Sequence, residues 1–448
     1  MESLNILFIS SFPPDHSAGL ARDYMRALTS HGHTVDFLTR YDFPGQKDNE
    51  YNVYSERLSD KIRRFCRNHP LLQKLRFLRF LLHKDKIYPG KNSGIIITNL
   101  HEDVSPVNTD DILAEIENLN RPYDAVVTLF WQHMLTTVTL KAIYDKLNCP
   151  IIIWSVDMFT FTGGCFFFMD CRNFQLGCGC CPVLNSNDPD DQTAINFRIK
   201  KKMYASMNYA IGLNTWMQRF ALSTGLFDKR RVVYSSVAVD ENLFNIRPKN
   251  ECRRNLGLNN KKTFILFARH SDPNAKGKGF DYLVKAVNHF AAKLDKEEKR
   301  KCLIVLAGKG KDKNENGFDI DSLYIGSLAK AELIVAYNAS NVFLSPSIDD
   351  AGPSMVNQSI MCGTPAICFE IGTALDVIDN GISGYKVKVK DYEAFADAIY
   401  TIYNMPAEKY DKLQLSTREM ALKHNSLESF ARMIESTTQM LNKDEMKI

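Results

Sequence analysis

The sequence predicts an α/β protein made of two doubly wound, Rossmann-like domains that face a central cleft. Its 448 residues are 45% hydrophobic and 24% charged, an ordinary globular composition in a chain too long for a single core. Strand-length apolar runs alternate with helix-length amphipathic segments in two separate series, as in parallel sheets covered by helices. Because such sheets bind ligands at the carboxyl ends of their strands, we expect the substrate between the two halves.

The first series begins at the amino terminus. Residues 5–10 form a continuous apolar run that predicts a strand, a small-residue loop continues through Gly19, and residues 20–30 have the pattern of an amphipathic helix. Gly32 ends this helix, and a second strand at 34–39 completes a βαβ unit. We expect further buried parallel strands at 94–98, 124–130 and 150–156, and a helix at 136–147. Residues 45–93 lack this rhythm and are interpreted as an insertion.

The second series begins near residue 232. Its apolar runs predict strands at 263–268, 302–307, 324–325, 342–344 and 366–369. Helical periodicity recurs at 281–294, 329–338 and 392–403.

Charge and targeting signals limit the possible locations and partners. Lys plus Arg number 56 and Asp plus Glu 52, a net charge of +4, so nucleic-acid binding has no overall electrostatic footprint. The start Met-Glu-Ser lacks the basic lead of a secretory signal, and no apolar run reaches the roughly 18 residues that span a bilayer. We therefore expect a cytoplasmic protein whose 11 cysteines are reduced thiols or metal ligands.

One short segment carries most of the basic charge. Residues 61–86 contain nine Lys or Arg and one acid, Asp85. Arg76 and Arg79 recur at helical spacing among Leu and Phe, as in a helix that lies on an anionic membrane surface. An amphipathic helix packed on its own domain explains the same pattern, and both interpretations stay open.

The segment 345–365 has the features of an anion site. We expect the strand before it to end at Pro346 and a helix to run from near Pro353 to Gly363, after a short acidic loop. The backbone N–H groups at the start of that helix are then available to an anionic phosphate. The three residues that carry them are Ser354, Met355 and Val356.

Two further side chains flank this expected phosphate cradle. Asp350 precedes the helix, and Gln358 lies within it eight residues later. A carboxylate on one side and an amide on the other suit a sugar hydroxyl and a ribose.

The same segment resembles the retaining glycosyltransferases of family 4, which have the GT-B fold. Asp350 and Gln358 stand where the family signature usually has two Glu residues, and a Cys-Gly-x-Pro ending follows. The Asp-Asp-Ala-Gly-Pro run, which includes Gly352, is similar to a variant of polysaccharide-building members. The resemblance implies that Asp350 orients the donor sugar and that Gly352, the helix amides and Gln358 bind the donor.

The resemblance assigns further residues to the donor. Arg269 and Lys278 match the Arg and Lys that grip the donor diphosphate, with Lys276 as a substitute for Lys278. Two such cations stabilise the leaving diphosphate without a catalytic metal. Gly19 matches the opening loop whose backbone amides approach the donor phosphates. Asp157 is a candidate partner of the acceptor hydroxyl, and a loop or helix cap is the alternative.

Cysteines gather in the loop at 160–182. Cys165, Cys171, Cys178 and Cys181 are separated by five, six and two residues, and four thiolates at such spacing suit tetrahedral structural zinc. Free buried thiols and disulfides are the alternatives. Similar Thr-Gly-Gly-Cys loops occur in a polysaccharide or colanic-acid-type subgroup of the family.

These features predict a retaining hexosyl- or glycosyltransferase that moves a sugar from a nucleotide diphosphate sugar to a glycan or lipid-linked acceptor in surface polysaccharide biosynthesis. By analogy, residues 1–230 bind the acceptor, 231–424 bind the donor, and a helix at 425–448 packs back on the first domain. The enzyme is expected in the cytoplasm, with possible contact to the inner face of the membrane. A GT-B sugar-nucleotide epimerase and a non-catalytic, zinc-stapled binding or scaffold protein remain alternatives.

Overall fold

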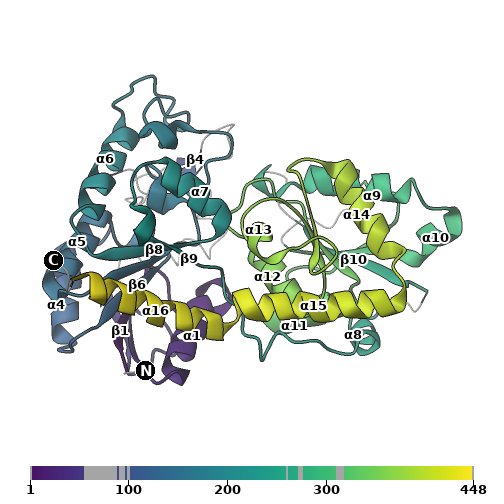
Figure 1. Cartoon of the computed structure of the whole chain (residues 1–448), viewed down its shortest axis with the longest axis horizontal. Helices are drawn as coiled ribbons and strands as arrows, with labels where there is room; N and C mark the ends of the chain where they lie inside the picture. Colours follow the sequence, from purple (N-terminus) through teal and green to yellow (C-terminus); the bar gives the residue numbers. More distant parts are fainter. Residues whose placement is uncertain are drawn as a thin grey trace, which may run out of the picture. The chain divides into compact units, whose positions relative to one another are not determined.

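The chain is divided into two compact units. A computed structural model describes residues 3–54, 88–89, 96–97, 101–258, 261–270, 276–308 and 317–445. Unit 1 comprises Met1–Leu213, Phe220–Val233 and Ala431–Ile448, and unit 2 comprises Asn214–Arg219 and Tyr234–Phe430. Each unit contains one main sheet with helices around it (Figure 1). The basic segment 61–86 lies outside the described residues, so both interpretations of it remain predictions.

Unit 1 is built on a seven-stranded sheet in the order β3-β2-β1-β6-β7-β8-β9. The pairs from β3 through β8 are parallel. Strand β1 consists almost wholly of apolar residues because it lies at the centre of the sheet, where Leu7 and Phe8 are fully buried. The strands are β1 (Asn5–Ser10), β2 (Thr34–Tyr41), β3 (Glu50–Tyr54), β6 (Ala125–Leu129), β7 (Ile151–Trp154), β8 (Tyr209–Leu213) and β9 (Val232–Tyr234).

Several helices of unit 1 begin at side-chain caps. Asn108 accepts a hydrogen bond from Asp110 N at 3.0 Å, and Asp191 accepts one from Thr193 N at 2.9 Å, which satisfies otherwise unpaired amides. The α-helices are α1 (His16–Ser30), α4 (Thr109–Asn118), α5 (Thr137–Leu147), α6 (Gln192–Tyr204) and α16 (Leu427–Glu445), with α7 (Thr215–Ser223) divided between the units. Short 3-10 turns are η2 (Trp131–His133), η3 (Phe159–Phe161), η4 (Asn173–Leu176) and η5 (Lys229–Arg231).

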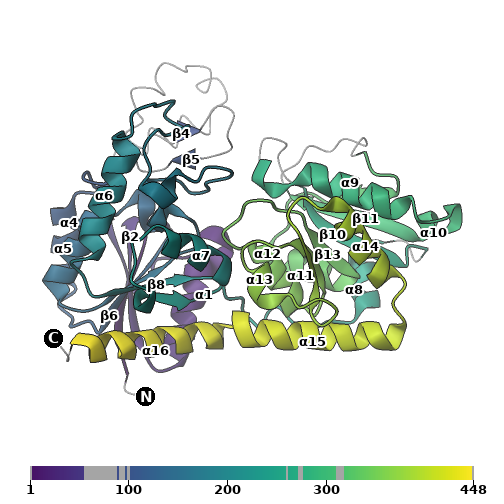
Figure 2. The same cartoon turned by 45° about the horizontal axis from the view of Figure 1, so that its top comes forward.

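Unit 2 has a six-stranded parallel sheet in the order β12-β11-β10-β13-β14-β15. Alternate residues of one strand enter different cores: Ile265 and Phe267 join one cluster, and Leu266 joins the other. Figure 2 shows helices on both faces of this sheet. The strands are β10 (Phe264–His270), β11 (Cys302–Gly308), β12 (Asp321–Tyr324), β13 (Val342–Ser345), β14 (Ala366–Phe369) and β15 (Gly384–Val387).

Each core of unit 2 is closed by its own helices. One cluster includes residues of α8 (Lys249–Asn255), α11 (Lys330–Ala339), α12 (Ser354–Met361), α13 (Ala374–Val377) and α15 (Ala407–Asn425). The other includes residues of α9 (Phe280–Ala291) and α14 (Tyr392–Tyr403). The remaining helices are η6 (Lys276–Lys278) and α10 (Lys296–Lys301). This doubly wound arrangement places the carboxyl ends of β10 and β13 beside each other, where a parallel sheet offers its ligand site.

Most expected elements are present, with several differences in unit 1. Strand β3 lies within residues 45–93, which the sequence analysis interpreted as an insertion, yet it pairs parallel with β2 in the main sheet. Strand β8 and helix α6 were not expected. Helix α1 begins at His16, four residues before the predicted start, and includes Gly19 with φ +82°. The prediction of a buried parallel strand at 94–98 is wrong, because β5 (Ile96–Ile97) pairs antiparallel with β4 (Tyr88–Pro89) in a separate small sheet. Ile97 is apolar because it is fully buried and forms an antiparallel bridge with Cys165. Among the described helices, none has the length and apolar character needed to cross a bilayer.

Candidate functional site

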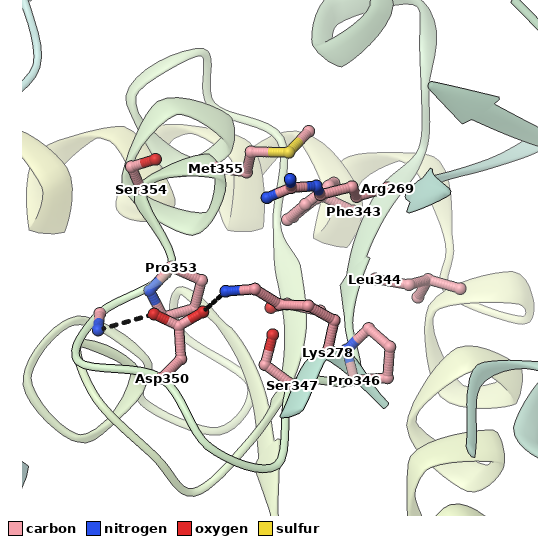
Figure 3. Close-up of a pocket in the computed structure, with 12 residues that line it drawn as sticks. Arg269, Lys278, Phe343, Leu344, Pro346, Ser347, Asp350, Pro353, Ser354 and Met355 are labelled. Atoms are coloured by element: carbon pink, nitrogen blue, oxygen red, sulfur yellow. Dashed lines mark hydrogen bonds and ion pairs between the residues drawn. The ribbon is translucent and has the colours of Figure 1, made fainter. Parts of the chain in front are cut away.

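A pocket of about 140 Å³ lies at the carboxyl ends of β10 and β13 in unit 2 (Figure 3). Both strands end here because parallel neighbours direct their carboxyl ends to one edge of the sheet. The pocket combines cations, one carboxylate and the start of helix α12. Its lining residues are Arg269, Lys278, Phe343, Leu344, Ser345, Pro346, Ser347, Asp350, Gly352, Pro353, Ser354 and Met355.

An ion pair joins the two sides of this pocket. The ammonium of Lys278 contacts Asp350 Oδ2, and Asp350 Oδ1 accepts a hydrogen bond from Gly352 N at 3.2 Å. The Asp350 side chain is 9% exposed and that of Lys278 25%, so the pair is largely shielded from solvent. In Figure 3 the guanidinium of Arg269 lies next to Met355 and the ammonium of Lys278 next to Asp350. The expected cations and carboxylate therefore line one pocket.

A tight turn before α9 holds Lys278 in position. The carbonyl of Gly277 accepts hydrogen bonds from Ile348 N at 2.8 Å and from Asp349 N at 3.2 Å, which ties the turn to the acidic loop. Gly279 has φ +65°, and a Cβ there would lie 1.9 Å from the carbonyl oxygen of Pro346. Only glycine fits this close backbone approach. The side chain of Lys276 lies outside the described part of the chain, so its substitute role stays a prediction.

Helix α12 begins at the pocket as the sequence predicts. Pro353 is the N-cap residue, and Ser354 and Met355 are the first two helical residues, whose N–H groups have no acceptor within the helix. Val356 differs from the prediction, because its N–H donates to the carbonyl of Pro353 at 2.9 Å. The amide contribution to an anion is thus limited to Ser354 and Met355.

Gln358 lies on α12 but is not among the residues that line the pocket. Its Oε1 accepts a hydrogen bond from the hydroxyl of Tyr337 at 3.0 Å, while Tyr337 packs in the core. This bond orients the amide and leaves the Nε2 group to donate elsewhere. A role of Gln358 toward ribose remains a prediction.

A buried polar network that the sequence analysis did not identify anchors α12. Asn357 Nδ2 donates to the carbonyl of Val237 at 2.7 Å, and Asn357 Oδ1 accepts from Thr373 Oγ1 at 3.0 Å. Ser236 Oγ accepts from Asn425 Nδ2 at 2.9 Å. Asn357 is fully buried, so these partners replace the water that it loses. The local signal was a polar Asn beside Gln358, but its partners come from distant segments.

In unit 1, Asp157 is buried rather than directed into open space. Its Oδ2 accepts from Gln132 Nε2 at 2.5 Å, and its Oδ1 accepts from Phe159 N at 2.9 Å at the start of η3. Burial raises the pKa of Asp157 to about 6. The residue is 5% exposed, and the capping alternative fits these contacts. A role of Asp157 toward the acceptor hydroxyl stays a prediction.

Gly19 also differs from its expected role. Its N–H donates to the carbonyl of Asp15 at 3.1 Å within the first turn of α1. This hydrogen bond occupies the amide that the resemblance assigns to the donor phosphates. Gly19 has φ +82° within this first part of the helix, a conformation that glycine adopts without a Cβ penalty.

The zinc prediction is not supported. Among the described residues, no group of three or more His, Cys, Asp or Glu side chains is arranged to hold a metal ion. Burial, together with the neighbouring thiols, raises the pKa of Cys165, and burial raises the pKa of Cys178 to about 12. Cys178 Sγ accepts from Gly163 N at 3.3 Å, and the described cysteines form no disulfides. The loop fits the alternative of free thiols.

Comparisons with known proteins give a family match in the second half of the chain. Residues 248–420 match the family model of the glycosyl transferases group 1. A glycosyl transferase group 1 domain lies within unit 2. An uncharacterized glycosyltransferase of Methanocaldococcus jannaschii is 22% identical over 205 residues, which are 41% of this chain and 50% of that protein. The chain thus matches only about half the length of this curated relative. The family match and this relative support the predicted class of enzyme, a glycosyltransferase.

Solved structures share the fold over nearly the whole chain. Sucrose-phosphate synthase from Thermosynechococcus elongatus is 16% identical with a TM-score of 0.62, covering 98% of this chain and 100% of its own. Anabaena HepE in complex with UDP and glucose is 13% identical with a TM-score of 0.61, covering 97% and 99%. A point mutant of S. aureus TarM, in complex with fondaparinux, α-GlcNAc-glycerol and UDP, is 11% identical with a TM-score of 0.57, covering 97% and 99%. The predicted GT-B fold with two Rossmann-like domains is confirmed.

Proposed function

We propose that the protein is a retaining glycosyltransferase that moves a sugar from a nucleotide diphosphate sugar to a glycan or lipid-linked saccharide in surface polysaccharide biosynthesis. The pocket of unit 2 carries this proposal, because Arg269 and Lys278 line it together with the start of α12. Two cations and a helix N-terminus are complementary to a diphosphate. Unit 2 accordingly binds the donor and unit 1 the acceptor.

Electrostatic stabilisation of the leaving group drives the proposed reaction. As the glycosidic bond to the diphosphate breaks, negative charge grows on the phosphate oxygens. Lys278, Arg269 and the amides of Ser354 and Met355 stabilise that charge from fixed positions. Asp350 accepts hydrogen bonds from donor sugar hydroxyls and holds the anomeric carbon in line with the acceptor. The expectation that no catalytic metal takes part rests on these cations.

Calorimetry with UDP tests the donor site directly, since HepE and TarM are described with UDP bound. The wild-type protein is expected to bind UDP, and Lys278→Gln to lower the affinity about tenfold to a hundredfold, the range for a lost charge-assisted contact. Lys285→Gln is the control, because Lys285 is an exposed lysine on α9. Unchanged affinity in Lys278→Gln would contradict the assignment of this pocket.

Two further measurements separate the alternatives. Thermal stabilisation by a panel of UDP-, GDP- and ADP-sugars identifies the base, because a ligand of the native state raises Tm. Products analysed with and without an acceptor glycan distinguish transfer from epimerisation. A protein that none of these nucleotides stabilises would be a binding or scaffold protein instead.

A further inference from the structure

Four aromatic side chains gather at one edge of the unit 1 sheet. Phe12 and His16 follow β1, and Phe130 and His133 follow β6. Strands β1 and β6 are parallel neighbours, and Ser11 N donates to the carbonyl of Phe130 at 3.2 Å, so the two loops leave the sheet side by side. We call Phe12, His16, Phe130 and His133 the aromatic cluster.

The rings of the aromatic cluster contact one another. Phe12 stacks on His16 with ring centroids 4.1 Å apart and an interplanar angle of 16°. Phe130 meets both rings edge-on at 6.2 and 6.1 Å, and His133 meets Phe12 edge-on at 5.6 Å. The four residues therefore form one continuous aromatic surface.

This surface is not part of the buried core. His16 is exposed and the other three residues are half-buried, whereas Phe8 and Phe37 of the same unit are fully buried. The His16 imidazole forms no hydrogen bond with a described side chain or backbone group. Although His16 is exposed as a residue, its ring is partly shielded from water, and this desolvation lowers its pKa. The neutral ring offers one N–H donor and one nitrogen acceptor.

Two local costs accompany the cluster. Phe130 adopts φ +49° and ψ +44°, a left-handed conformation that costs a residue with a Cβ about 1–2 kcal/mol. Ser11 is 3% exposed, and its hydroxyl has no hydrogen-bond partner among the described atoms. A strained backbone and an unsatisfied buried hydroxyl at one strand edge indicate that this edge is shaped for a ligand.

The charges beside the cluster argue against an anionic ligand. Arg22 is ion-paired with Asp15 and Glu50 at 2.6 Å each, so its charge is already compensated by two carboxylates. Arg40 Nη1 also donates to the carbonyl of His133 at 2.7 Å. Two arginines therefore face two carboxylates, and this place offers no net positive charge to the phosphates of a nucleotide. A neutral sugar ring, with apolar C–H faces and a rim of hydroxyls, matches aromatic faces bordered by imidazole and hydroxyl groups.

We propose that the aromatic cluster binds a pyranose ring of the acceptor saccharide, stacking it on Phe12 and bonding its hydroxyls to the exposed imidazole of His16. The role as acceptor rests on the proposed function, whereas sugar binding at this edge does not.

Saturation-transfer NMR on the full chain tests this site with the methyl pyranosides of glucose, galactose, mannose and N-acetylglucosamine. At least one glycoside is expected to receive saturation, strongest at its ring C–H protons. Phe12→Leu removes the ring but keeps apolar volume, so its Kd for that glycoside should rise about tenfold. Phe12→Tyr keeps the aromatic face and should stay within about twofold. Phe166→Leu, at a half-buried ring elsewhere in unit 1, is the control.

Calorimetry of the same variants with UDP separates the two proposals. Equal glycoside binding in wild type and Phe12→Leu, or no binding to wild type, overturns the sugar site while UDP affinity leaves the donor site intact. If Phe12→Leu binds UDP more weakly but binds the glycoside as wild type does, the proposed sugar site is overturned, and the aromatic cluster binds a nucleobase instead. Glycoside binding lost in Phe12→Leu supports the site, even where wild type fails to bind UDP and the proposed function fails.

Discussion

The ion pair between Asp350 and Lys278 joins two residues with different proposed tasks. In the proposed complex the lysine binds the diphosphate and the carboxylate binds the sugar. In the structure the two side chains form an ion pair with each other. A buried unpaired charge is costly, so the ion pair compensates both charges and orients both side chains. An arriving diphosphate competes with Asp350 for the ammonium of Lys278.

This competition predicts opposite effects of Asp350→Asn on binding and on transfer. Without the carboxylate charge, phosphate has one competitor fewer for the ammonium of Lys278, so UDP affinity should stay equal or rise. The transfer rate should fall about a hundredfold, because the donor sugar loses an orienting acceptor. Calorimetry and a transfer assay with UDP-glucose measure the two quantities. Asp379→Asn is the control, since Asp379 has a 57% exposed side chain. Reduced UDP affinity in Asp350→Asn would refute this view.

Asp157 predicts a pH dependence of stability in unit 1. Burial raises its pKa from 3.8 to about 6, so the folded chain holds a proton that the unfolded chain releases between pH 4 and 6. Stability from this group is therefore largest at low pH and decreases by about 3 kcal/mol as pH rises through about 6. In Asp157→Asn this loss should vanish, so the variant gains on wild type between pH 4.5 and 7 in urea unfolding. If the free energies of unfolding of the two proteins changed equally with pH, a contribution of Asp157 to this pH dependence would be excluded.

At the scale of elements, the turn of Gly277 to Gly279 fixes the distance between α9 and the acidic loop. Gly279→Ala places a Cβ 1.9 Å from the Pro346 carbonyl oxygen and should destabilise unit 2 by about 2 kcal/mol or more. UDP affinity should fall with it, because Lys278 follows the turn. Gly257→Ala is the matched control, since its φ of +64° is the same but no atom lies within 4 Å. If thermal unfolding showed that Gly279→Ala and Gly257→Ala lose equal stability, the positive φ alone, and not the close contact with Pro346, would explain the destabilisation.

The elements show what the sequence predicts well. Strands β1 and β14 and helix α14 have the predicted bounds, because continuous apolar runs and helical periodicity are local signals. Strand β8 and helix α6 were not predicted. Helix α6 has Lys200 fully buried, where its ammonium donates to the carbonyls of Phe159 at 2.6 Å and Thr162 at 3.0 Å. Because the hydrogen-bond partners of Lys200 lie some forty residues away in the sequence, its charge makes the buried face of α6 look polar in the sequence.

The same distinction applies to the candidate site. Lys278, Asp350 and Ser354 were predicted because their motifs are contiguous in the sequence. The network of Asn357 and Asn425 was missed, since hydrogen bonds across many residues leave no local spacing. The hydrogen bond from Gln132 to Asp157 was missed for the same reason, because Gln132 comes from a different loop.

At the scale of the whole molecule, the chain returns to unit 1 after completing unit 2. Residues Ala431–Ile448 belong to unit 1. Within this segment, the side chain of Glu435 on α16 is buried. Glu435 Oε1 accepts from His33 Nε2 at 2.9 Å and from His31 Nδ1 at 3.0 Å. His33 Nδ1 accepts from Leu4 N at 3.2 Å, so its proton is on Nε2 and points to Glu435. The carboxyl-terminal segment thus completes the polar contacts of the first helix–strand turn.

We therefore expect Glu435→Ala in the full chain to weaken unit 1 selectively. Two imidazoles lose their acceptor, and a buried donor without a partner costs roughly 2 kcal/mol. Hydrogen exchange followed by mass spectrometry should show amides of β1 and β2 exchanging about thirtyfold faster, with β10 and β13 unchanged. Ser436→Ala, an exposed change on the same helix, should alter neither. Equal acceleration in both units would mean that they unfold together, and no acceleration would mean that α16 is held by its apolar face alone.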